Sequence, residues 1–342
     1  MEIKKTKILM IIILLSVGTV KNLNAVSFSG SGTEQDPYLL STEAHLSELA
    51  DSVNRFPMKW NSEKYFEVMN DITDTVRTII GSYERKFQGN FCGNNKIINL
   101  ALTINSVYVG LFGYIDTIGV VKNVEVNGYI YNEHFSYSTF PRKAGIASTN
   151  EGKISNCINR CPISIYSNSM TGDYAGGITA INWGIVDNCL NSGNIEVFYH
   201  DVGGIAAWNY ETISNSTNTG SVTAKVYGAG GIAGFTWPGG AIFNCVNTGA
   251  VTALMHASGI TYCVGGTVSN CSNYGFIKGN SYIGGISSVA QIAIIINNFN
   301  NGVVEGNEYV GCIVGSAETT PWSPIPSIIE NNHYDKQMCG EE

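Results

Sequence analysis

One pattern of hydrophobic and polar positions repeats along the middle of the chain, between about residues 172 and 304. Each copy begins with two glycines and an isoleucine, weakened to Ser258-Gly259-Ile260 in one copy, and later reaches an asparagine-centred segment such as Asn188-Cys189-Leu190-Asn191. The isoleucines are 27, 27, 28 and 26 residues apart: Ile178, Ile205, Ile232, Ile260 and Ile286. A period this regular predicts a structural repeat in which each copy forms one unit of a stack.

Each period holds short apolar segments separated by Gly and Asn, for example residues 202–206, 212–214 and 221–224. A single short strand cannot bury its apolar face, but coiling stacks each strand ~4.8 Å above its counterpart in the previous turn. The sequence therefore predicts an all-β fold, a right-handed parallel β-helix (β-solenoid) of about ten rungs. We expect the glycine pair to precede a strand that starts at the isoleucine.

The last asparagine of each segment is expected at a corner of the coil, as for Asn191 and Asn218. There it would join an amide ladder along the axis and would accept a left-handed backbone bend at low cost. Gly accounts for 39 of 342 residues and charged residues for only 13%, which also favours a β-solenoid with many tight corners.

The chain divides into four predicted parts. Residues 1–25 have a basic start, an apolar core and a small-residue cleavage site, which is typical of a signal peptide and too short for a membrane span. Residues 26–64 form an N-terminal cap, residues 65–335 the β-helix repeats, and residues 336–342 a C-terminal tail. In the cap, one short amphipathic helix would cover the first rung with Leu46, Leu49, Ala50 and Val53.

The net charge of −8 argues against a nucleic-acid partner, which would need a basic face. No segment after the signal peptide is long and apolar enough to span a membrane. These features together predict a secreted or cell-surface protein.

Four of the nine cysteines recur at one repeat position, which Ser216 and Asn298 occupy in other copies: Cys157, Cys189, Cys245 and Cys271. We expect a column of small buried residues, and the alternative is disulfides between neighbouring rungs. The sequence contains no Cys-x-x-Cys pair with a nearby His, which is the arrangement typical of a zinc site. We therefore predict no metal and no cofactor.

Aromatic residues follow the isoleucine in four successive copies: Trp183, Trp208 with Tyr210, Trp237, and Tyr262. They should lie near one edge of the rod, where exposed rings could stack on sugar rings or anchor a protein partner. The alternative is that these rings cover the corner of the coil and pack on each other. The predicted partners are a glycan or a host or extracellular protein surface.

An enzyme is the competing interpretation, because parallel β-helices include polysaccharide lyases and hydrolases. Glycoside hydrolysis normally needs two carboxylates that face one cleft, and the acidic residues of the repeats are scattered. The five histidines form no His-Glu-x-x-His motif. We therefore predict no catalytic residue and keep a carbohydrate-active enzyme (a polysaccharide lyase or hydrolase) as the alternative.

The segment Gly110-Leu111-Phe112-Gly113 and the Gly-Gly-Ile … Asn-Cys-x-Asn copies resemble the GLUG-motif family, a bacterial extracellular repeat group. The N-terminal Gly-Ser-Gly-Thr and Asp-Pro-Tyr segments and the Asn-Asn-His-Tyr tail are similar to those of Bacteroidetes surface proteins that carry such repeats. The resemblance implies surface adhesion or a non-catalytic module beside a peptidase, and it supplies no catalytic residue. The predicted function is that of a non-catalytic secreted or cell-surface binding or adhesion protein.

Overall fold

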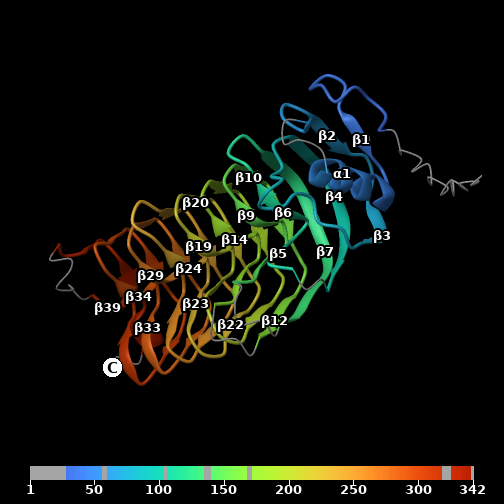
Figure 1. The fold of residues 1–342 in the computed structure, drawn as a ribbon. Helices are drawn as coiled ribbons and strands as arrows, with labels where there is room; N and C mark the ends of the chain where they lie inside the picture. Colours follow the sequence, from blue (N-terminus) through green and yellow to red (C-terminus); the bar gives the residue numbers. More distant parts are fainter. Residues whose placement is uncertain are drawn as a thin grey trace, which may run out of the picture.

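The computed structural model describes residues 28–55, 60–103, 106–134, 140–167, 172–317 and 325–339, so the predicted signal peptide lies outside it. The chain forms a parallel β-solenoid of about nine turns with one α-helix near the N-terminus. Figure 1 shows the turns stacked in chain order from the helix end to the C-terminal end. The predicted all-β parallel β-helix is therefore confirmed.

A regular turn contains five short strands, whereas the sequence predicted three. In one turn these are β18 (Val202–Gly203), β19 (Ala206–Asn209), β20 (Thr212–Ser214), β21 (Thr217–Asn218) and β22 (Val222–Ala224). The prediction was wrong because the bend at the glycine pair divides the predicted segment 202–206 between two strands, and because β21 forms at a position predicted to be a corner.

Two eight-stranded parallel sheets are formed by the first two strands of each turn. The first, here called the β18 sheet, contains β5 (Tyr108–Val109), β8 (Arg142–Ala144), β13 (Tyr174–Gly176), β18, β23 (Gly228–Gly230), β28 (His256–Ser258), β33 (Ser281–Gly284) and β38 (Glu308–Gly311). The second, the β19 sheet, contains β6 (Phe112–Ile115), β9 (Ala147–Asn150), β14 (Thr179–Asn182), β19, β24 (Ala233–Thr236), β29 (Thr261–Val264), β34 (Ser287–Ala290) and β39 (Val314–Ser316).

The remaining strands form one 25-stranded sheet that bends around the rest of the coil. It starts with β1 (Tyr38–Leu40), β2 (Tyr65–Val68), β3 (Ile72–Val76) and the long strands β4 (Asn90–Leu102) and β7 (Val120–His134). The β20 column contains β10 (Lys153–Ser155), β15 (Ile185–Asp187), β20, β25 (Ala241–Phe243), β30 (Thr267–Ser269), β35 (Ile294–Ile296) and β40 (Ile328–Glu330). The β21 column contains β11 (Ile158–Asn159), β16 (Leu190–Asn191), β21, β26 (Val246–Asn247), β31 (Ser272–Asn273), β36 (Phe299–Asn300) and β41 (His333–Tyr334). The β22 column contains β12 (Ile163–Ser167), β17 (Ile195–Val197), β22, β27 (Val251–Ala253), β32 (Ile277–Lys278) and β37 (Val304–Glu305).

The N-terminal cap contains the predicted helix, α1 (Glu43–Arg55), and it buries the predicted apolar face of Leu46, Leu49, Ala50 and Val53. Strand β1 precedes this helix and pairs in parallel with β2, so the first rung already begins inside the segment predicted as the cap. At the other end, the tail contains a short 3-10 helix, η2 (Lys336–Cys339).

The glycine pair forms the bend between the β18 and β19 sheets and does not start a strand at the isoleucine, as the sequence had suggested. Gly203 ends β18, Gly204 and Ile205 form the bend, and Ile205 points into the buried core. A Cβ atom on Gly204 would lie 2.1 Å from the Gly231 carbonyl oxygen and 2.3 Å from the Asn218 side chain. Only glycine fits, because the asparagine of the opposite corner packs against this bend.

The predicted amide ladder is present along the opposite corner. The Nδ2 of Asn191 donates to the Oδ1 of Asn218 at 2.8 Å, and Asn218 donates in the same way to Asn247 at 2.8 Å. The ladder runs through Asn159, Asn191, Asn218, Asn247, Asn273 and Asn300, all fully buried. Each of these buried amides is thereby paired, as a buried polar group must be for stability.

The left-handed bend, however, belongs to a different asparagine. The ladder residues lie in strands, whereas the first asparagine of each segment has positive φ, for example Asn188 (φ 50°) and Asn215 (φ 50°). The sequence analysis assigned both roles to one residue. The structure divides them, because the bend faces solvent while the ladder needs a buried position.

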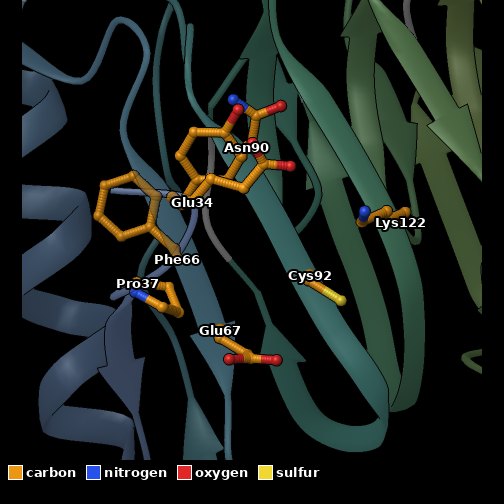
Figure 2. A pocket seen from close by; sticks show the side chains of 8 residues that line it. Glu34, Pro37, Phe66, Glu67, Asn90, Cys92 and Lys122 are labelled. Carbon is orange, nitrogen blue, oxygen red and sulfur yellow. The ribbon is translucent and has the colours of Figure 1, made fainter. Parts of the chain in front are cut away.

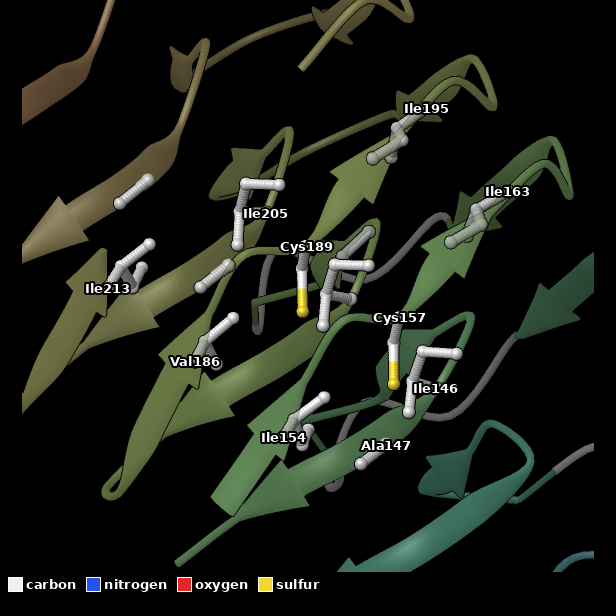
Figure 3. Close-up of a cluster of buried hydrophobic side chains, with 14 of the residues drawn as sticks. Ile146, Ala147, Ile154, Cys157, Ile163, Val186, Cys189, Ile195, Ile205 and Ile213 are labelled. Atoms are coloured by element: carbon white, nitrogen blue, oxygen red, sulfur yellow. The ribbon is translucent and has the colours of Figure 1, made fainter. Parts of the chain in front are cut away.

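The cysteine column consists of small buried residues, as expected. Cys157, Cys189, Cys245 and Cys271 are free thiols in the core, in line with buried Ser216 and Asn298. Figure 3 shows Cys157 and Cys189 side by side among the stacked isoleucines. Cys312, which lies outside this column, is disulfide-bonded.

One charged residue interrupts the apolar columns. Lys143 in β8 stands in register with Val109 and Ala175, which point into the core, and it is itself fully buried. Its ammonium group donates a hydrogen bond to the Ser106 carbonyl oxygen. Burial lowers the pKa of Lys143 to about 7, and the nearby charge of Asp173 opposes this shift.

The two asparagine roles are separable by experiment. We expect Asn218→Gly to lower the free energy of unfolding by about 2–5 kcal/mol, because it leaves the buried amides of Asn191 and Asn247 without their partner. Asn215→Gly in the same turn should change it by less than about 1 kcal/mol, because glycine accepts the positive φ. Urea unfolding followed by circular dichroism measures both, and equal losses in the two variants would contradict the division of roles.

Candidate functional site

One outward-facing position recurs directly after each strand of the β19 sheet. The N–H of Trp183 bonds to the Asn150 carbonyl at 2.7 Å, and that of Tyr210 bonds to the Asn182 carbonyl at 2.9 Å. Each residue at this position therefore lies one rung, ~4.8 Å, from the next. The residues at this position in the first five strands are Asp116, Glu151, Trp183, Tyr210 and Trp237, which we call the edge column; Gly265, Gln291 and Ala317 follow the last three strands.

The three aromatic members of the edge column are stacked on one another. The ring centroids of Trp183 and Tyr210 are 3.5 Å apart with 10° between their planes, and those of Tyr210 and Trp237 are 5.3 Å apart with 6° between them. Both faces of Tyr210 are thus covered. Trp183 ends the stack, is 49% exposed, and turns its second face toward the rung of Glu151.

The other two aromatic residues singled out from the sequence lie outside this column. Trp208 is inside β19, where its Nε1 donates to the Asp201 carboxylate at 2.5 Å and its ring lies 4.4 Å from that of Tyr174. It packs over the buried cluster of Tyr174, Ala180 and Ala207. Tyr262 lies within β29 in the register position of Gly234, and its side chain is outside the described residues.

Glu151 is held by two neighbours. Its Oε1 accepts a hydrogen bond from the Tyr114 hydroxyl at 2.6 Å, and its Oε2 pairs with the Lys86 ammonium at 2.6 Å. The Lys86 Nζ also lies 4.5 Å from the centre of the Tyr114 ring. Burial raises the pKa of Tyr114, and the hydrogen bond to Glu151 and its charge raise it further. This arrangement fixes the Glu151 carboxylate one rung from Trp183, with the Lys86 ammonium paired to it.

Asp116 occupies the same position one rung before Glu151. Its carboxylate accepts hydrogen bonds from the Gln88 side chain at 2.7 Å and from the Thr117 N–H at 2.6 Å. Burial by itself would raise the pKa of Asp116, but the hydrogen bonds from Gln88 and Thr117 outweigh burial, so the pKa lies below its usual value. Asp116 is therefore ionised at neutral pH.

The two carboxylates were missed in the sequence, although a signal for them exists. Every member of the edge column follows the buried leucine or isoleucine of its repeat by five positions: Leu111, Ile146, Ile178, Ile205 and Ile232. The sequence argument considered this offset only for aromatic residues and only from Ile178 onward. Extending the repeat to its first two irregular copies would have placed Asp116 and Glu151 in line with Trp183.

A separate pocket of about 150 Å³ lies near the N-terminal end, where Figure 2 shows Glu67, Cys92 and Lys122 around it. It shares no residue with the edge column. Within the described ranges, no three His, Cys, Asp or Glu side chains are close enough to hold one metal ion. Among the same residues, no helix is long and apolar enough to cross a membrane.

Comparison with known proteins supports the fold more than the function. No family model matches the chain. A protein of Evansella cellulosilytica named "Putative Gly-rich membrane protein" is 31% identical over 116 residues, which cover 31% of this chain and only 12% of that protein. The match is thus confined to a small part of a much longer relative.

A solved structure named as a "putative immunoglobulin A1 protease" from Bacteroides ovatus is similar over 90% of this chain and 86% of that one. Its TM-score is 0.53 and its sequence identity 16%. At this identity the likeness shows the β-helix fold alone. It is consistent with the parallel β-solenoid described above.

The unfolding free energies of two variants test whether these stacked rings stabilise the fold. Tyr210→Ala should lower the free energy of unfolding by about 2–4 kcal/mol, because it removes two stacked contacts and opens the middle of the column. Trp183→Ala should cost about 1 kcal/mol, because half of its surface is already in water. Urea unfolding followed by near-ultraviolet circular dichroism measures both. A Trp183→Ala loss as large as that of Tyr210→Ala would contradict the assignment of Trp183 as the open end.

Proposed function

We propose that the protein is a non-catalytic secreted or cell-surface binding protein that recognises a glycan at the open end of the edge column. The observation that carries this proposal is the half-exposed ring of Trp183, which ends an ordered aromatic stack one rung from Glu151. The GLUG-like sequence pattern and the predicted signal peptide agree with an extracellular role. An adhesion function follows if the glycan belongs to another cell or to a matrix.

The chemistry suits a sugar ring. The C–H face of a pyranose is apolar and packs against an indole, while its hydroxyls need charged or polar partners at the rim. Glu151 provides an acceptor on the adjacent rung, and Lys86, which reaches Glu151 from two rungs earlier, provides a donor. Because Tyr210 and Tyr114 already hold Trp183 and Glu151 in place, binding orders few additional side chains.

The stacked geometry also limits the size of the site. Tyr210 offers no free face, so a glycan cannot stack ring by ring along the whole column. The proposal is therefore one stacked sugar at Trp183, with neighbouring sugars extending over the rungs of Glu151 and Asp116.

A glycan array followed by calorimetry on the best neutral oligosaccharide tests the proposal. We expect Trp183→Ala to weaken binding by about tenfold or more, since a buried aromatic anchor typically contributes at least that much. Tyr274→Ala is the matched control, because Tyr274 is also 49% exposed but lies outside the edge column. No binding by the parent protein, or equal binding by Trp183→Ala, would refute a glycan site at Trp183.

A carbohydrate-active enzyme is the second candidate, and one observation favours it. Asp116 and Glu151 lie one rung apart next to the aromatic platform, and the two carboxyl groups of retaining glycosidases lie about 5–5.5 Å apart. In that case the ionised Asp116 would be the nucleophile, and Glu151 would have to release Lys86 and take up a proton to act as the acid.

Release of new reducing ends from a panel of polysaccharides separates the two candidates. The binding proposal predicts no release by the parent protein. Release that disappears in both Asp116→Asn and Glu151→Gln would establish the enzyme instead, because neither amide can act as nucleophile or acid. Release that survives both variants would point to a contaminating hydrolase.

A further inference from the structure

A second surface with different chemistry lies on the β22 column of the large sheet, away from the edge column. A groove of about 420 Å³ crosses β22, β27 and β32 and is lined by Thr223, Lys225, Thr252, Leu254, Lys278 and Asn307, among others. In Figure 1, strand β22 is labelled in the lower part of the rod.

The groove runs along the rod axis, because its lining follows the register of successive rungs. Thr223 pairs with Thr252, and Thr252 with Lys278, while their neighbours Val222, Val251 and Ile277 are buried beneath. Lys225 belongs to the rung of Thr223, so Lys225 and Lys278 stand two rungs apart, ~10 Å along the axis.

Each lysine forms an ion pair with a glutamate that lies farther along the rod axis, on the side away from the other lysine. The Lys225 Nζ lies 2.7 Å from the Glu196 carboxylate, and the Lys278 Nζ lies 3.1 Å from that of Glu305. The order along the axis is therefore Glu196, Lys225, Lys278, Glu305, with Thr252 and Leu254 on the rung between the lysines. All four charged side chains are at least one-third exposed, and such ion pairs stabilise the fold little.

We propose that this groove binds a linear acidic polysaccharide that carries one carboxylate per disaccharide. Two successive carboxylates would pair with Lys225 and Lys278, whose separation of two rungs is close to one disaccharide of an extended chain. The sugar between them would lie on the half-exposed Leu254, and its hydroxyls would bond to Thr223 and Thr252. Because the present ion pairs are weak and exposed, the lysines can exchange Glu196 and Glu305 for a ligand at little cost.

The flanking glutamates also define what the groove excludes. A nucleic acid carries a phosphate at every nucleotide, so several phosphates would fall beside Glu196 and Glu305. An acidic polysaccharide with widely spaced carboxylates avoids this repulsion. The site does not depend on Trp183 or on the function proposed for the edge column.

Fluorescence anisotropy with a labelled hyaluronan octasaccharide, which has one carboxylate per disaccharide, tests the inference on the full chain. We expect Lys225→Gln/Lys278→Gln to weaken binding by about tenfold, since two ion pairs are lost. Glu196→Gln/Glu305→Gln should tighten it severalfold by releasing both lysines. Lys153→Gln removes an exposed lysine from another part of the surface and should change nothing. Trp183→Ala should also leave hyaluronan binding unchanged, which keeps this site distinguishable from the edge column.

Three results would overturn the inference: no binding of the octasaccharide by the parent protein, an equal loss in Lys153→Gln, or equal binding of a neutral oligosaccharide. A single-stranded DNA oligomer that binds as tightly and shows the same losses would also overturn it, because the groove would then respond to any polyanion.

Discussion

The close packing of the asparagine ladder against the glycine bend is the constraint on which each turn depends. The ladder amides bond to one another and to a glycine carbonyl two residues later, as Asn218 does with Gly220. On the other side they touch the bend at positions such as Gly204, where a Cβ atom would clash with them. Two corners of the coil are therefore in direct contact at this point. The glycine pair and the asparagine segment of the repeat form the two sides of this contact. This explains why the glycine pair and the asparagine segment recur together in the sequence.

Regular stacking converts every position of the repeat into a column along the rod. Inside, the columns are filled by isoleucines, free cysteines and amides, and each rung contacts mainly its two neighbours, so local stability depends on nearest-neighbour contacts. Outside, the same stacking places side chains from distant parts of the chain one rung apart. The edge column and the lysine groove are both products of this geometry, because each takes one residue from each of several turns.

The two surfaces differ in how rigid they are. In the edge column, Trp183 and Glu151 are held by stacking and by hydrogen bonds before any ligand arrives. In the groove, Lys225 and Lys278 have exposed partners that they can exchange. If both proposals hold, the edge column binds a glycan at one fixed sugar and the groove binds a second chain through its charges.

The sequence by itself determined the repeat, the coiled β architecture, the capping helix, the buried cysteine column and the amide ladder. A fixed period specifies which residues stack, and burial then follows from their apolar or small side chains. The sequence did not determine where the chain bends inside a repeat, so it gave three strands per turn and assigned both asparagine roles to one residue. For the same reason it could not separate Trp208, which packs on Tyr174 outside the edge column, from Trp183, which ends the stack. Nor could it show that Lys143 is buried or that Lys225 and Lys278 share a groove. These outcomes depend on side-chain direction at the corners, and only the packing of neighbouring rungs decides that direction.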